Sequence, residues 1–208
     1  MSDDPDNHKL HVNNNGPTND VIEQRTWEWF SAAVSKRYGP AHYHLLDGAL
    51  SVHWPDVAAV RAHDRVGFEI TSPLRPEDVV PKRTAETNGD DDDEVDPRAL
   101  KQRLFEQRIV EAVTRKIKKY GRHPLSEPLA LLITLAHPSS LRFFSAGNVP
   151  RLSKIVRSHL INFVHQPIDA IYLVGPGEKA YLLWRRRGSR WKKLFPDLDT
   201  LNGTPRPS

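Results

Sequence analysis

The sequence predicts one α/β domain in which a mixed β-sheet is flanked by helices. Two β-rich segments, residues 57–60 and 65–70, follow a helical pattern at residues 19–38 and precede a long amphipathic pattern at residues 98–120. A continuous apolar run at residues 129–136 then indicates a strand buried on both faces. The 208 residues, 38% of them hydrophobic, suit one such domain with a sizeable core.

Capping residues, helix breakers and turn dipeptides mark the first elements along the chain. Residues 1–18 are polar and predict a flexible arm, and the domain is expected to span residues 19–195. The first helix begins at the capping residue Asn19 and ends before Gly39 and Pro40. Strand-forming residues at 42–46 and 49–54 are separated by Asp47 and Gly48, a dipeptide typical of hairpin turns.

The hairpin at residues 57–70 carries the most informative chemistry. If Val60 faces Arg65 across a polar loop, counting outward along both strands places Asp56 opposite Glu69. Alternation then places both acids and Thr71 on one face and the apolar residues of the hairpin on the other. Two opposed carboxylates repel each other unless a cation lies between them or one of them is protonated. A bound divalent ion would remove the conflict, whereas a turn-capping Asp56 and a solvated Glu69 form the structural alternative.

The spacing of these residues resembles a known nuclease motif. Pro55 and Asp56, then twelve residues, then Glu69, Ile70 and Thr71 resemble the motif of the PD-(D/E)xK nuclease superfamily, and the element order agrees with its αβββαβ restriction-endonuclease-like core. The resemblance implies that Asp56 and Glu69 bind Mg²⁺ or Mn²⁺. It also implies that the carbonyl group of Ile70 and an acid on the preceding helix, Glu23, join them as ligands.

The motif departs from the family pattern at Thr71, where the family has lysine. A hydroxyl group supplies no cation to orient the attacking water or to stabilise the charge that develops on the phosphate. The resemblance allows a lysine or glutamine on the following helix to compensate, for which Lys101 and Gln107 are candidates, as is Lys82. The departure keeps two hypotheses open: a metal-dependent nuclease, and a noncatalytic nuclease-fold protein that binds nucleic acid or a protein partner.

The segment after Thr71 divides into an acidic loop and a basic helix. Residues 72–96 contain three prolines and the run from Asp90 to Asp93, which predicts a long loop insertion. Pro97 opens the next helix, whose expected core stripe is Leu100, Leu104, Ile109, Val113, Ile117 and Tyr120. Residues 97–123 hold nine Lys and Arg residues and two acids. The polar face of this helix is therefore either a phosphate-binding track, with Lys101, Arg108, Arg115 and Lys119 as candidates, or a solvated surface.

The C-terminal third predicts a helix at residues 148–163 and two closing strands, residues 170–174 and 180–184, joined by a turn at Gly175. Basic residues interleaved with tryptophan follow. They predict contacts with single-stranded or distorted nucleic acid, or an edge strand protected by charge; the candidates are Arg185, Arg186, Arg187 and Trp191. Residues 196–208 are expected to form a flexible tail.

Composition excludes several kinds of site and restricts the expected location of the protein. The chain has no cysteine, which excludes disulfides, thiolate metal sites and cysteine nucleophiles. The N-terminus has no apolar signal region, and the longest apolar run is too short to cross a bilayer, so we expect a cytoplasmic protein without membrane contact. Nucleic acid is the expected partner, and the sequence leaves self-association open.

Overall fold

The structure is a computed structural model that describes residues 19–40, 42–46, 55–61, 63–73, 97–121, 127–136, 146–163 and 165–198. The expected N-terminal arm, the predicted strand at residues 49–54, most of the acidic loop with Lys82, and residues 199–208 lie outside the described residues.

A six-stranded mixed sheet forms the centre of the molecule. Its strands lie in sequence order: β1 (His44–Leu45), β2 (Val57–Arg61), β3 (Asp64–Thr71), β4 (Leu129–Thr134), β5 (Ala170–Gly175) and β6 (Lys179–Arg185). Strands β1 to β3 form an antiparallel meander, β3, β4 and β5 are parallel, and β6 is antiparallel to β5. The predicted α/β class, a mixed sheet flanked by helices, is therefore confirmed.

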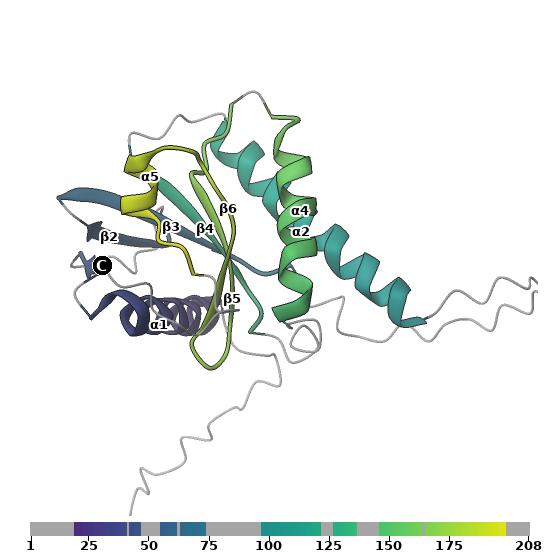
Figure 1. Ribbon diagram of the computed structural model, residues 1–208, viewed down its shortest axis with the longest axis horizontal. Helices are drawn as coiled ribbons and strands as arrows, with labels where there is room; N and C mark the ends of the chain where they lie inside the picture. Colours follow the sequence, from purple (N-terminus) through teal and green to yellow (C-terminus); the bar gives the residue numbers. More distant parts are fainter. Residues whose placement is uncertain are drawn as a thin grey trace, which may run out of the picture.

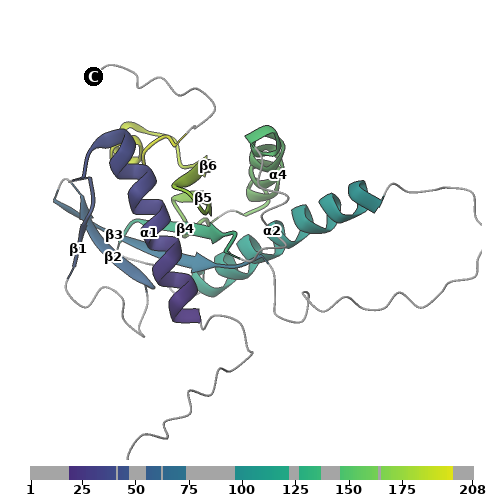
Figure 2. The same ribbon diagram turned by 90° about the horizontal axis from the view of Figure 1, so that it is seen from below.

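Helices cover both faces of the sheet (Figures 1 and 2). On one face lie α1 (Asn19–Tyr38) and the short α5 (Ser189–Leu194); on the other lie α2 (Pro97–Gly121) and α4 (Val149–Leu160), the latter preceded by the 3-10 turn η2 (Ala146–Asn148). Each face has its own hydrophobic cluster because side chains alternate along the strands: Phe68 and Tyr172 pack toward α1, whereas Leu131 and Leu173 pack toward α2 and α4.

The register of the β2–β3 hairpin is the one that the sequence predicts. Val57 pairs with Phe68 and Val60 with Arg65. The connection is tighter than expected, because the strands continue to the pair Arg61 and Asp64 and so include the ends of the predicted four-residue loop. Only two residues remain between them, and His63 adopts a left-handed φ of 73°. The predicted apolar face of the hairpin is buried against α1.

Two expectations about the edges of the core are wrong. On α2, Leu100 and Leu104 are 50% and 47% exposed, and Phe105 is the first buried aromatic of the stripe. The first two turns of this helix extend past the sheet (Figure 2), so Leu100 and Leu104 do not pack on it. The segment after β6 turns into α5, a helix that the sequence pattern does not predict, and Leu198 is only 1% exposed. The core thus continues three residues past the expected domain end.

No helix among the described residues is both long enough and apolar enough to cross a membrane.

Candidate functional site

A close approach between Pro55 and Gly67 sets the position of Asp56. A Cβ atom placed on Gly67 would lie 3.1 Å from the Cβ atom of Pro55 and 3.3 Å from Cδ1 of Leu129. The missing side chain of Gly67 therefore leaves room for Pro55 to pack on β3. Asp56 follows immediately before β2, one residue outside the Val57–Phe68 pair, so that the same register continued by one residue leads to Glu69.

Asp56 is held by the backbone of the neighbouring strand. Its Oδ2 atom accepts a hydrogen bond of 2.6 Å from the backbone N–H group of Ile70. Burial raises the pKa of the Asp56 carboxyl, and the negative charge of Glu69 raises this pKa further. The hydrogen bond from Ile70 and the charges of Lys116 and Lys119 lower it, but by less. The two acids are therefore close enough for the charge of Glu69 to raise the pKa of Asp56, as the sequence predicts.

Glu69 is the most deeply buried acid of the hairpin. It is 1% exposed and points toward α2, where the ammonium groups of Lys116 and Lys119 both contact its Oε1 atom. The Lys119 contact measures 3.2 Å. These lysines are three residues apart and therefore share one face of the helix. The Oε2 atom of Glu69 is buried and has no hydrogen-bond partner in the part of the chain that the structure describes.

Thr71, at the position of the family's lysine, also meets a cation. A guanidinium N–H group of Arg115 donates a hydrogen bond of 3.2 Å to its Oγ1 atom. The last turns of α2 therefore present Arg115, Lys116 and Lys119 to the same end of β3 that carries Glu69 and Thr71. Positive charge is supplied here by a helix rather than by the strand.

The candidates proposed to replace the lysine lie elsewhere on α2. Lys101 is exposed and precedes Lys116 by 15 residues, about 22 Å along the helix at 1.5 Å per residue. Gln107 donates a hydrogen bond to Glu111 on its own helix. Lys116, on the same helix, was not among the candidates. The available signal was its position beside the buried Val113 and Ile117, where a long side chain can extend along the sheet.

Asp56 and Glu69 supply carboxylate oxygens, the type of ligand that Mg²⁺ takes. Mg²⁺ is commonly bound through one or two carboxylates together with water and substrate oxygens, and the buried Oε2 atom of Glu69 is a free oxygen of this type. Among the described residues, no three His, Asp or Glu side chains group closely enough to hold a metal. Glu23 is therefore not grouped with Asp56 and Glu69; it is half-buried near the start of α1. Ile70 could contribute only its carbonyl group, because its side chain is in the core.

The basic segment at the end of β6 is largely engaged in internal contacts. The ring of Trp191 stacks on Phe195 at an interplanar angle of 4°, and the guanidinium groups of Arg186 and Arg190 lie over it at 5.3 and 5.4 Å. Arg185 forms an ion pair with Asp197, whereas Arg187 is exposed. Trp191 is therefore part of the packing of α5, and its ring is not available as an open stacking platform. Arg108, the remaining candidate on α2, is half-buried.

Comparison of this chain with models of protein families, with curated proteins and with solved structures finds no match.

Proposed function

We propose that this protein is a metal-dependent nuclease with a restriction-endonuclease-like core. The observation that carries the proposal is the meeting of Asp56, Glu69 and Lys116 at the end of β3. The αβββαβ order of α1 to β4, with β3 parallel to β4, supports the same proposal because it is the order that the resemblance implies. The substrate class is nucleic acid, whose phosphodiester groups suit a site that combines carboxylates with nearby cations.

Each side chain has a distinct role in this proposal. Asp56 and Glu69 would hold Mg²⁺ or Mn²⁺, with the carbonyl group of Ile70 as a further ligand. The metal, when bound, supplies Lewis acidity and lowers the pKa of a coordinated water. Lys116 and Lys119 provide the positive charge that Thr71 lacks, next to the place where negative charge develops on a phosphate.

A second candidate function is binding of nucleic acid without cleavage. One observation favours it: two ammonium groups already compensate the Glu69 carboxylate, so the buried charge needs no metal ion for its stability. In that case Asp56, Glu69 and the lysines form a structural ion-pair network under α2.

Divalent ions and matched variants test the metal site. Thermal melting in EDTA, and then with increasing Mg²⁺ or Mn²⁺, should show stabilisation that rises with ion concentration, and Asp56→Asn should abolish it. Asp64→Asn is the control, because Asp64 begins β3, the strand of Glu69, and its carboxylate pairs with the exposed Arg190. It should retain the response to metal.

Cleavage assays then separate the two functions. Plasmid, linear duplex and single-stranded substrates should be cut by the wild type in Mg²⁺ or Mn²⁺. Asp56→Asn and Lys116→Gln should each reduce the rate by about a hundredfold or more. Metal-dependent stabilisation without cleavage would disprove the nuclease, and no stabilisation at all would disprove the metal site. Salt-dependent binding with neither effect would establish the noncatalytic alternative.

A further inference from the structure

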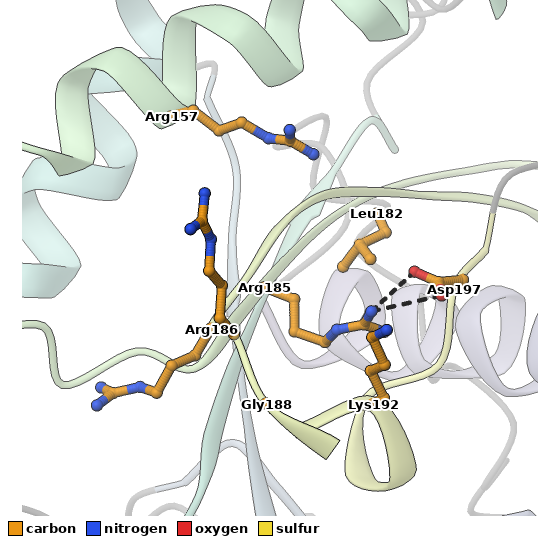
Figure 3. A pocket seen from close by; sticks show the side chains of 8 residues that line it. Arg157, Leu182, Arg185, Arg186, Gly188, Lys192 and Asp197 are labelled. Carbon is orange, nitrogen blue, oxygen red and sulfur yellow. Dashed lines mark hydrogen bonds and ion pairs between the residues drawn. The ribbon is translucent and has the colours of Figure 1, made fainter. Parts of the chain in front are cut away.

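A pocket of about 300 Å³ lies between α4, the end of β6 and α5 (Figure 3). Five cationic side chains line it, accompanied by one carboxylate: Arg157, Arg185, Arg186, Arg187, Lys192 and Asp197. They come from α4, the end of β6, α5 and the residues on either side of α5. Arg157 extends from α4 toward β6, and Arg185 projects from the end of β6 (Figure 3).

Two of these arginines are fixed by the protein. Arg185 donates a hydrogen bond of 2.6 Å to the carbonyl group of Phe195 and pairs with Asp197 at 3.1 Å, and its side chain is only 10% exposed. Arg186 lies 2.8 Å from the Asp169 carboxylate and donates to the carbonyl group of Gln166. Carboxylates thus compensate these two charges, and the guanidinium groups form a preorganised wall.

The other three cations are not compensated. Arg157, Arg187 and Lys192 are exposed, and no hydrogen bond or ion pair holds any of them within the described part of the chain. Cations gathered around one pocket repel each other, and a multiply charged anion in the pocket would relieve that repulsion. A ligand with a single carboxylate group would neutralise only one of these three charges.

We propose that this pocket binds the phosphate group of a phosphomonoester. A terminal phosphate carries close to two negative charges at neutral pH and offers three acceptor oxygens. Guanidinium groups match this geometry with paired N–H donors, and four of the five cations are arginines. A volume of about 300 Å³ also leaves room for the group to which the phosphate is attached.

This pocket is distinct from the carboxylate site. Phe68, next to Glu69, is in register with Ala130, Ala170 and finally Arg185, so three strand spacings, about 14 Å, separate the pocket from β3. The proposal does not rest on metal binding by Asp56 and Glu69, and either site can fail its test without the other.

Titration calorimetry of the 208-residue chain with pyrophosphate tests the pocket. The wild type should bind saturably, and the double variant Arg157→Gln/Arg187→Gln should lose about tenfold or more in affinity. The control is Lys154→Gln/Lys193→Gln, which removes two exposed charges adjacent to the pocket but outside its lining. Its affinity should stay within about twofold, because general surface charge contributes little at physiological salt.

Oligonucleotides distinguish the two sources of a phosphate group. If the ligand is the end of a nucleic acid, a single strand with a 5′-phosphate should bind more tightly in EDTA than the same strand with a 5′-hydroxyl. The Arg157→Gln/Arg187→Gln variant should lose this difference in affinity. Equal binding of the two strands, with displacement of pyrophosphate by a nucleoside monophosphate, identifies a small ligand. Either result supports the pocket. Absence of saturable pyrophosphate binding, or an equal loss of affinity in the control variant, overturns the pocket. Melting temperatures show whether the double variant is folded, and the single variant Lys192→Gln repeats the test if it is not.

Discussion

Asp56 combines a strong local hydrogen bond with an unfavourable electrostatic environment. Its Oδ2 atom is held at 2.6 Å by the N–H group of Ile70, while burial and Glu69 raise the pKa of its carboxyl group. A carboxyl whose pKa is higher in the folded than in the unfolded state favours folding when it is protonated. Its contribution to stability is therefore complete below the unfolded-state pKa of 3.8 and declines as the pH rises through the folded-state value.

We therefore expect Asp56→Asn to increase the free energy of unfolding at neutral pH in EDTA. Asparagine keeps an oxygen acceptor for the N–H group of Ile70 and removes the desolvated charge. The gain should shrink as the pH falls toward 3.8, where the wild-type carboxyl becomes protonated. Urea denaturation of both proteins from pH 7 downward measures the difference. A gain that is independent of pH, or a loss at neutral pH, would contradict this account of Asp56.

Lys116 is the principal neutralising partner of Glu69. Its side chain is 15% exposed, compared with 55% for Lys119, so it interacts with Glu69 in the less solvated position. Lys116→Gln should reduce the free energy of unfolding by roughly 2 kcal/mol, less than the loss of a sole buried partner because Lys119 remains.

A double-mutant cycle measures the Lys116 contribution. Glu69→Gln should remove most of the Lys116→Gln effect, since the charge that needs compensation is then absent. Lys118→Gln, on the exposed side of the same helix turn, serves as the control and should change stability by less than about 0.5 kcal/mol. Equal effects of the 116 and 118 substitutions would rule out a specific pairing with Glu69.

At the scale of elements, α2 has two parts with different roles. Its C-terminal half packs on the sheet through Ile109, Val113 and Ile117, and this packing directs Lys116 and Lys119 to Glu69. Its first two turns extend past the sheet, as both views show (Figures 1 and 2). A basic residue on α2 therefore contributes to the candidate site only if it lies in the packed half.

The short helix α5 depends on Trp191 for its attachment to the sheet. The indole ring stacks on the buried Phe195 and lies beneath two guanidinium groups. We expect Trp191→Ala to lower the free energy of unfolding by about 2 to 3 kcal/mol, because the side chain is only partly buried. Trp191→Phe should lose about 1 kcal/mol or less, since stacking is retained. Reduced affinity for a single strand without loss of stability would instead indicate a base-stacking role.

Across the whole molecule, the candidate site and the pocket lie at different places on one sheet. The formal net charge is only +4, so long-range attraction to nucleic acid depends on where the cations gather. Among the described residues, cations gather beside the carboxylate site at the C-terminal half of α2. They also gather around the pocket at the end of β6.

The salt dependence of binding shows which of these surfaces contacts phosphates. If α2 contacts the backbone of a single strand, Lys119→Gln should lower the slope of log affinity against log salt by about 0.7. Lys36→Gln should leave the slope unchanged, because Lys36 lies on α1 and pairs with Glu178. Fluorescence anisotropy in EDTA over a range of salt concentrations gives the slopes. An unchanged slope for Lys119→Gln would remove α2 from the interface.

Local patterns in the sequence determined most of the sheet and its helices. The register of β2 and β3 could be counted because the turn between them is short and side chains alternate with a period of two. The same counting placed Asp56 opposite Glu69. The limits of α1 and the start of β4 followed from capping signals, breakers and apolar runs, which act over a few neighbouring residues.

Only the tertiary structure decided which cations meet Glu69. Nine basic residues lie between positions 97 and 123, and the long segment after Thr71 fixes no register between β3 and α2, so spacing could not select Lys116 over Lys101. The burial of Leu198 and the packing of α5 were also decided by contacts with distant strands. Chain periodicity specifies which face of an element is apolar, but the position of one element along another depends on packing between residues far apart in sequence.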